Sequence, residues 1–557
     1  MFHEWLPKSF VYLRQYDRKL FKKDLLAGIT VGIVALPLAM AFAIASGVSP
    51  EKGIFTAIVA GFLISALGGS AVQIGGPTGA FVVIVYDVLQ RTGYEGLSLS
   101  TLLAGLLLVF LGFFRIGSWI KYVPYSLITG FTSAIAVIIF SSQMRDFFGL
   151  SINKLPASFI FQWIEYIKAF PSLHVPTLAV GMGTLICIYL LRKFFPRIPW
   201  GIASIVLATC ATSFFHLPVE TIYSKFSSLP TMLPKPQWPS LNVPFDKLPE
   251  IIRDSFAIAF LGGIESLLSA VIADGMLGTR HKSNCELVGQ GLANIGSVLF
   301  GGIPATGAIA RTATNVKAGA QTPVAGMVHA LVLLLVLVFL SPLVNQIPLA
   351  GLAAILITVA WNMSEMEHFF RLVRSPTSDT AILLAAFFLT IFVDITVAIM
   401  VGMVLASFLF MKKMSAHSKT IPFEPTSEFP EKQDLDSIQR KQVPEGVEVY
   451  EMQGPFFFGS ADILQNLIVN FTKPPKVFIL RMRQVPFIDA SGVQALLEFS
   501  KQCKKHQTVF LISGIHGQMK KDLETFKLTR RLGEEHVFSH IDEALTKARL
   551  LLEISEK

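Results

Sequence analysis

Two apolar stretches of this 557-residue chain are interrupted by glycine and proline where a membrane helix should be continuous. The first interruption, at residues 75–81, reads GGPTGAF, and the second, at residues 301–311, reads GGIPATGAIAR. A bilayer tolerates non-helical backbone only where protein or a water-filled cavity surrounds it. Broken segments at matching positions of two halves indicate the binding site of a transporter.

The composition sets the class of protein in which these breaks occur. Hydrophobic residues make up 52% of the chain and charged residues 15%, whereas soluble proteins carry about 25% charged residues. The net charge of +9 does not indicate a nucleic-acid partner, because Lys and Arg cluster beside the apolar runs, as the positive-inside rule predicts. The four cysteines are scattered without metal-ligand or disulfide spacing, so we expect no metal site.

The apolar runs predict a polytopic α-helical membrane protein with fourteen spans in two sets of seven. The expected spans are 25–46, 53–69, 78–90, 99–116, 124–142, 175–192 and 200–216, then 255–273, 286–300, 308–320, 323–343, 347–361 and two within 379–411. The last stretch is expected to turn near Asp394. Spans 3 and 10 are the short, broken ones, and seven is odd, so the second set has inverted topology.

The basic residues give the orientation. Clusters of Lys, Arg and His follow the even-numbered spans, which places both termini in the cytoplasm. Residues 1–24 form a basic amphipathic arm without a signal-peptide cleavage site. The transport domain is expected over 25–413, with repeats at about 25–216 and 255–411.

The composition becomes that of a soluble protein after the last span. Residues 414–445 read as a charged linker, and 446–557 alternate between strand and helix patterns, which predicts a small cytoplasmic α/β domain. The expected strands are 447–452, 476–482 and 509–513, and the expected helices are 461–471, 491–504, 517–527 and 540–553.

Four segments carry a resemblance to a known family. They are Asp24–Gly47, Gly262–Ser269, Pro304–Asn315 and Ile488–Gly492. With the first break, they resemble the SulP anion permeases, or solute carrier family 26, which end in a STAS domain. The resemblance implies a homodimeric anion transporter that is not an enzyme. Residues 265–291 and 360–365 are most similar to the bacterial, DauA-like branch of C4-dicarboxylate transporters, which implies the bacterial inner membrane.

The two breaks have a direct physical interpretation. A helix N-terminus carries roughly half a positive charge and several free N–H groups, so two facing half-helices would form an anion site. Two packed kinks without a ligand are the alternative. The residues expected to line the site are Pro37, Met40 and Phe42 of the first span, Thr78, Gly79, Ala80 and Phe81 of the first break, and Ala310, Arg311 and Thr312 of the second.

Two charged residues in apolar surroundings point to substrate binding and coupling. Arg311 is expected either to attract the anion or to form a salt bridge with Glu265, and a competition between these partners would reconcile both roles. Burial favours the neutral form of a carboxyl group, so Glu265 could carry a proton. The resemblance places cation coupling at Glu265 and at Ser269, one turn later. Some sodium-coupled bicarbonate members carry Asp and Thr there, so sodium is the alternative.

Other positions are expected to be structural or regulatory. Asp87, Asp274, Glu286 and Asp394 are interpreted as interfacial or structural residues near span ends. In the STAS domain, Ser491 matches a serine that is phosphorylated in related regulators, and it follows Asp489. Its favoured interpretation is a helix N-cap. This domain would serve in regulation, dimer contacts or docking of a cytoplasmic protein. Many animal members carry Gln directly after Pro37, where this chain has Leu38, so their substrate preferences do not carry over.

These observations lead to one functional hypothesis with several alternatives. We expect a secondary active transporter of sulfate, a C4-dicarboxylate or bicarbonate, working by proton symport. An elevator movement would carry spans 1–4 and 8–11 past the other spans. No nucleotide-binding motif or cofactor site is present, so the driving force is a proton or sodium gradient, or exchange. The alternatives are a sodium-coupled bicarbonate transporter, an anion exchanger or channel, and a signalling scaffold built on the STAS domain.

Overall fold

The computed structural model forms two compact units, Met1–Val404 and Leu405–Lys557. It describes the chain except for residues 1–4, 14–15, 118–121, 153–154, 157, 196–198, 241–243, 375–376, 423–440, 459–463, 465–473 and 556–557.

The first unit is built from apolar helices, because a bilayer requires every backbone group to find its partner within the spanning segment. Among the described residues, eight helices are long and apolar enough to cross a membrane, and three shorter helices are also apolar. The principal helices are α2 (Arg18–Ala45), α3 (Pro50–Leu67), α4 (Gly79–Phe113), α5 (Tyr125–Ser142), α8 (Val175–Phe194), α9 (Trp200–Phe214), α11 (Leu248–Leu277), α12 (Ser283–Leu299), α13 (Ile309–Lys317), α14 (Val324–Phe339), α16 (Leu349–Met363), α18 (Thr377–Phe392) and α19 (Ile395–His417).

Each expected span overlaps one of these helices. The boundary between spans 3 and 4 and the boundary between the last two spans show which residues interrupt the helices. Spans 3 and 4 form the single helix α4, which is broken at Gly93, where φ is +72° and ψ is −176°. Such a conformation favours glycine, since it has no Cβ. The predicted turn at Asp394 separates α18 from α19, and its carboxylate accepts a hydrogen bond from the Val397 N–H at 2.8 Å. The number of helices that cross the bilayer remains a prediction.

The order of elements repeats in the two halves. The first half runs α2, α3, β1 (Gly75–Gly76) and α4, and the second runs α11, α12, β2 (Thr306–Gly307) and α13. Strands β1 and β2 pair antiparallel, with Gly75 opposite Gly307 and Gly76 opposite Thr306. The two breaks thus pair with each other across the repeats.

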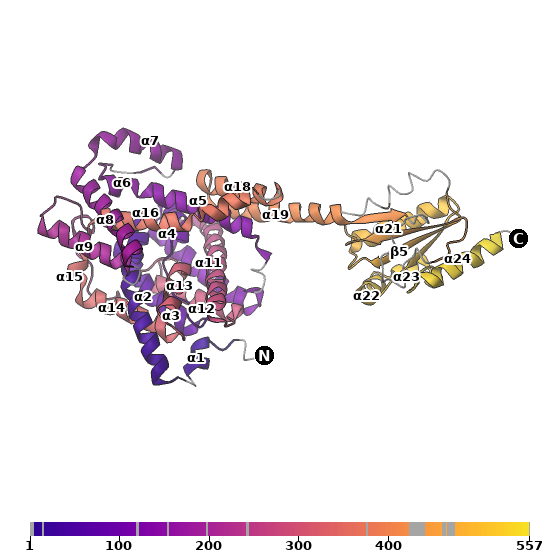
Figure 1. Ribbon diagram of the computed structural model, residues 1–557, viewed down its shortest axis with the longest axis horizontal. Helices are drawn as coiled ribbons and strands as arrows, with labels where there is room; N and C mark the ends of the chain where they lie inside the picture. Colours follow the sequence, from indigo (N-terminus) through magenta and orange to yellow (C-terminus); the bar gives the residue numbers. More distant parts are fainter. Residues whose placement is uncertain are drawn as a thin grey trace. The chain divides into compact units, whose positions relative to one another are not determined.

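The helices pack in two groups (Figure 1). Helices α2, α3, α4, α11, α12, α13 and α14 pack against one another and form the core group. Helices α5, α8, α9, α16 and α18 form the gate group. The core group holds the helices that correspond to predicted spans 1–4 and 8–11. The two groups meet where α4 contacts α5 and where α2 contacts α9 and α16.

Shorter helices precede or connect the long ones. They are α1 (Lys8–Leu13), α6 (Met144–Phe148), α7 (Phe159–Ala169), α10 (Ile222–Phe226), α15 (Ser341–Val344) and α17 (Met366–Val373). Helix α7 carries its apolar side chains at amphipathic spacing, and few of its residues are buried.

The second unit is a four-stranded sheet with helices on it. Its strands are β3 (Lys419–Pro422), β4 (Val447–Gln453), β5 (Val477–Gln484) and β6 (Val509–Ser513), in the order β3-β4-β5-β6. The helices are α21 (Ala490–Lys505), α22 (Gly517–Thr525), α23 (Leu528–Leu532) and α24 (Ile541–Ser555). Alternate residues of β5 enter two separate apolar clusters, Phe478 with α21 and Ile479 with α24. A strand buried on both faces is expected in the parallel part of a sheet.

One element of this unit differs from the prediction. Strand β3 lies in the stretch expected to be linker, where it pairs antiparallel with β4, while β4, β5 and β6 are parallel. The helix predicted at 461–471 lies outside the described residues apart from Leu464. The other predicted strands and helices of this domain are observed.

Candidate functional site

The pairing of β1 with β2 brings the starts of two half-helices together. The Ala308 N–H donates to the Ile74 carbonyl at 2.8 Å, which extends the pairing by one residue. Helix α4 begins at Gly79 and α13 at Ile309, each directly after its strand, and neither start has a side-chain cap. The first N–H groups of a helix lack partners within the helix, and its N-terminus is electropositive. This region therefore has the polarity that an anion requires.

Arg311 extends from the second half-helix to the first break. Its side chain is buried at 3% exposure, and its Nη2 donates to the Pro77 carbonyl. Its Nη1 is buried and has no hydrogen-bond partner among the described residues. A Cβ on Gly76 would lie 2.7 Å from Nη1, and the φ of Gly76 is +146°, so the approach requires glycine. The guanidinium group thus has N–H donors left for a ligand.

Glu265 lies on α11 and is buried at 9% exposure. Within the described part of the chain, its carboxyl group makes no hydrogen bond and no ion pair. The salt bridge to Arg311 that the sequence left open is not formed, because Arg311 turns toward Pro77 instead. A buried carboxyl group without a partner is suited to carrying a coupling ion.

Ser269 and Thr312 connect α11 to both breaks. Their hydroxyl oxygens are 3.0 Å apart, and the Thr312 hydroxyl accepts the Ile74 N–H at 3.1 Å. Both side chains are fully buried. Ser269, one turn after Glu265, therefore holds α11 against the pair of half-helices.

The other predicted residues of the two breaks lie at the starts of the half-helices, and they differ in how far they are exposed. Thr78 is buried and its hydroxyl has no partner in the described structure. Ala80 and Phe81 are buried, and a Cβ on Gly262 would meet the Phe81 ring at 3.2 Å. A Cβ on Gly79 would lie 2.8 Å from the Met363 sulfur, so the gate group closes one side of the site. Ala310, in contrast, is exposed.

The site residues predicted in the first span lie on α2, which contacts the second half-helix α13. Pro37, Met40 and Phe42 are all buried in α2, with Pro37 inside the helix. Helix α2 packs against both α13 and α16. The three residues therefore belong to a helix that contacts both the second half-helix and the gate group.

A buried polar network, which the sequence did not reveal, supports the breaks. The Gln73 amide donates to the Ser266 hydroxyl at 2.9 Å, and Ser266 donates to Glu286 at 3.0 Å. The other Glu286 oxygen accepts the N–H groups of Gly69 at 2.8 Å and Ser70 at 3.0 Å. These contacts and the full burial of the side chain agree with the structural interpretation of Glu286.

Two amide side chains on α12 hold the second break. Asn294 donates to the Ala305 carbonyl and accepts the Ala305 N–H, both at 2.9 Å, and Gln290 also donates to that carbonyl. Glu286, Gln290 and Asn294 recur every four residues, which places them on one face of the helix. This spacing is the sequence signal that would have revealed the network.

In the STAS domain, Asp489 and not Ser491 is the N-cap residue of α21. The cap of α21 is Asp489, whose carboxylate accepts the Gly492 N–H at 2.8 Å and the Phe458 N–H at 3.1 Å. Ser491 lies in the first turn and is exposed. The interpretation of Ser491 as the N-cap is therefore wrong, because Asp489 fills that position.

A helical membrane unit with two facing half-helices, followed by an α/β unit, defines the class as a multi-pass membrane transporter. A model of the Sulfate permease family matches residues 21–386, and a model of the STAS domain matches residues 439–544. The chain belongs to this family, which is the SulP or solute carrier 26 family, and carries a C-terminal STAS domain.

Relatives and solved structures support the same assignment. "Putative sulfate transporter YvdB" of Bacillus subtilis is 40% identical over 95% of this chain and 98% of its own. "Bicarbonate transporter BicA" of Picosynechococcus is 29% identical over 95% of this chain and 94% of its own. The SLC26A9 structure, 20% identical, matches the fold over 99% of this chain and 94% of that chain with a TM-score of 0.86. The family consists of anion transporters, not enzymes.

Proposed function

We propose that this chain is a secondary active transporter of small anions, with sulfate as its leading substrate and the proton as its coupling ion. The observation that carries the proposal is the buried Arg311 Nη1, which has no hydrogen-bond partner among the described residues and lies beside two helix N-termini. A desolvated cation without a counter-charge is costly. A bound dianion would supply that charge and accept the free N–H groups.

The choice of sulfate rests on the relatives. The 40% identical protein is named for sulfate, and BicA, at 29% identity, is named for bicarbonate. Bicarbonate with sodium is therefore the second candidate. The C4-dicarboxylate substrate remains a prediction of the sequence resemblance to the DauA-like branch.

Coupling is assigned to Glu265 because its carboxyl group is buried and pairs with none of the residues that the structure describes. A neutral carboxyl group needs no counter-charge, so a protonated Glu265 fits these surroundings better than an ionised one. The Ser269 hydroxyl is already hydrogen-bonded to Thr312. This contact supports a role for Ser269 in positioning α11 while Glu265 is protonated. Sodium would need additional oxygen ligands beside Glu265.

The experiment is uptake into proteoliposomes of radiolabelled sulfate, bicarbonate, succinate and fumarate under imposed pH or sodium gradients. We expect an inward proton gradient to drive sulfate uptake. Glu265→Gln should abolish this stimulation and retain sulfate counterflow at equal pH, because the anion site is intact. Glu250→Gln on the same helix is the matched control. Sodium dependence without pH dependence would overturn proton coupling, and failure to move any anion would overturn the transport proposal.

We further propose an elevator movement of the core group against the gate group. The separate packing of the two groups supports this movement, and Gly79 faces Met363 at their boundary. A disulfide in the double variant Gly79→Cys/Met363→Cys should stop uptake under oxidation, and a reductant should restore it. The single-cysteine variants should not respond to oxidation. Undiminished uptake in the fully cross-linked protein would exclude relative movement at this boundary.

Location and assembly follow from the same proposal. We place the protein in the bacterial inner membrane with both termini in the cytoplasm, since basic residues follow the even-numbered spans. We also expect a homodimer whose STAS domain docks a cytoplasmic protein. Protease accessibility of the STAS domain in inside-out vesicles checks the orientation, and light scattering of the purified protein checks the dimer.

A further inference from the structure

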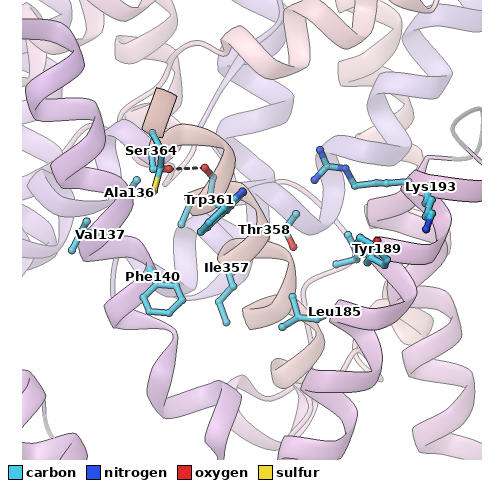
Figure 2. Close-up of a pocket in the computed structure, with 14 residues that line it drawn as sticks. Ala136, Val137, Phe140, Leu185, Tyr189, Lys193, Ile357, Thr358, Trp361 and Ser364 are labelled. Atoms are coloured by element: carbon cyan, nitrogen blue, oxygen red, sulfur yellow. Dashed lines mark hydrogen bonds between the residues drawn. The ribbon is translucent and has the colours of Figure 1, made fainter. Parts of the chain in front are cut away.

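A cavity lies within the gate group, and it is separate from the candidate anion site. Its volume is about 760 Å³, and its walls come from α5, α8 and α16. The sticks in Figure 2 show side chains of these helices converging on it. None of the residues predicted for the anion site lines this cavity. An occupant of this cavity would therefore be a different molecule from the transported anion.

The walls of the cavity are apolar over most of their length. Phe140 of α5, Leu185 and Ile188 of α8 and Ile357 of α16 line it. The lining of α8 extends from Leu185 to Lys193, which corresponds to about 12 Å of helix at 1.5 Å per residue. This length suits the upper part of an extended hydrocarbon chain.

The cavity has cations at one end only. Arg192 and Lys193 lie in the last turn of α8, and both are exposed. In the described part of the chain, neither pairs with a carboxylate. Arg192 lies 5.8 Å from the Trp200 ring, and Lys193 lies 5.5 Å from the Phe194 ring. Their charges are therefore available to an anionic group at this end.

Aromatic side chains mark the same end of the cavity. Trp361 is 70% exposed and Tyr189 is 62% exposed, and both line the cavity near the cations. Trp and Tyr concentrate at the boundary between hydrocarbon and headgroups. Basic residues at helix ends lie at the same level. The cavity thus begins at headgroup depth and continues into the hydrocarbon.

We infer that this cavity binds an anionic phospholipid, with one acyl chain against α5, α8 and α16 and the headgroup phosphate at Arg192 and Lys193. Charge complementarity selects the lipid, because a zwitterionic lipid offers the same phosphate but brings a trimethylammonium group beside the two cations, whereas an anionic lipid keeps its net negative charge there. The volume lies in the range of sites that enclose small molecules. The inference does not depend on which anion is transported.

The test is native mass spectrometry of the full-length protein, titrated with phosphatidylglycerol or phosphatidylcholine of identical chains. We expect phosphatidylglycerol to bind with about tenfold lower Kd, given two basic contacts at the headgroup. Arg192→Gln/Lys193→Gln should remove this preference. Lys22→Gln/Lys23→Gln, another exposed basic pair at the start of α2, should retain it.

A second variant tests the apolar wall without changing charge. Thr358→Phe adds a ring to the cavity lining and should weaken the binding of both lipids. Equal binding of the two lipids by the unmodified protein would overturn the inference. So would a preference that survives in Arg192→Gln/Lys193→Gln, or a Thr358→Phe variant that binds both lipids normally.

Discussion

Arg311 combines burial, a single carbonyl contact and an unpaired Nη1. Removing an isolated cation from water costs several kcal/mol even after the protein relaxes. An arriving anion would offset that cost, so under the proposed function the residue is better satisfied with substrate than without it. The contact with Pro77 fixes the direction of the guanidinium group toward the first break.

Replacing Arg311 tests this role. Arg311→Gln should raise the KM for sulfate at least about tenfold, since hydrogen bonds to charged groups contribute about 1.5–3 kcal/mol. Arg311→Lys should rescue little, because an ammonium group lacks the planar fork that contacts Pro77 and the ligand together. Sulfate uptake at graded concentrations measures the effect. Arg371→Gln on exposed α17 is the control, and an unchanged KM in Arg311→Gln would contradict the assignment.

The sequence singles out residues for the candidate site, and it says less about the contacts that they make. Arg311 and Glu265 were conspicuous because charges are expensive in apolar spans. The alternative of an ion pair between them is not observed among the described residues, and the sequence could not decide this because it does not give the direction of a side chain on its helix. The same limit explains the error at α21, where Asp489 and Ser491 are both good capping residues and only the geometry identifies Asp489.

At the scale of elements, the half-helices depend on supports from other parts of the chain. The breaks leave backbone groups without helical partners, and each must be satisfied in a buried region. Asn294 on α12 satisfies both groups of Ala305, and Thr312 satisfies the Ile74 N–H. The geometry of the two breaks is therefore fixed by side chains on α12 and α13 as well as by the breaks themselves.

Removing one support should disturb stability and transport together. Asn294→Ala deletes both hydrogen bonds to Ala305 and leaves the Ala305 N–H without an acceptor, which should cost about 1–3 kcal/mol and lower Tm. Uptake should fall as well, because the half-helix loses its anchor. Thr314→Ala, which removes one exposed hydrogen bond on α13, should be close to neutral. Thermal unfolding in detergent measures both variants, and a wild-type Tm for Asn294→Ala would refute the supporting role.

The breaks were predictable because their signal is local. Glycine and proline within an apolar run disrupt a helix whatever surrounds it. Strand β3 could not be found in this way, because its pairing partner near Gln453 lies more than thirty residues further along, beyond a charged segment. The supporting network was missed for the same reason, since it joins α11, α12 and the two breaks.

At the scale of the whole molecule, the two units have separate apolar cores. The STAS domain buries Phe478, Leu496 and Phe510 in one cluster and Ile479, Leu511 and Leu545 in another. Every residue of these clusters belongs to the second unit. Each unit should therefore unfold as its own cooperative transition.

A single core substitution distinguishes the two transitions. Leu496→Ala should destabilise the STAS domain by about 2–5 kcal/mol, since Leu496 is fully buried. The transition of the membrane unit should not move. Scanning calorimetry or hydrogen exchange of the full chain measures both, with the exposed Leu550→Ala as control. A parallel shift of both transitions would show that the units do not unfold independently.

The architecture as a whole was predictable because a bilayer permits so few solutions. Hydropathy and basic residues located the helices, and inversion of the repeats followed from an odd number of spans.

The paired breaks also constrain how the protein is made. Gly75 and its partner Gly307 are 232 residues apart (307 − 75). At about 5–20 residues per second, the ribosome needs roughly 10–50 s to reach the second strand after completing the first. During that interval the insertion machinery, and not the protein itself, must shelter the unpaired backbone of the first break.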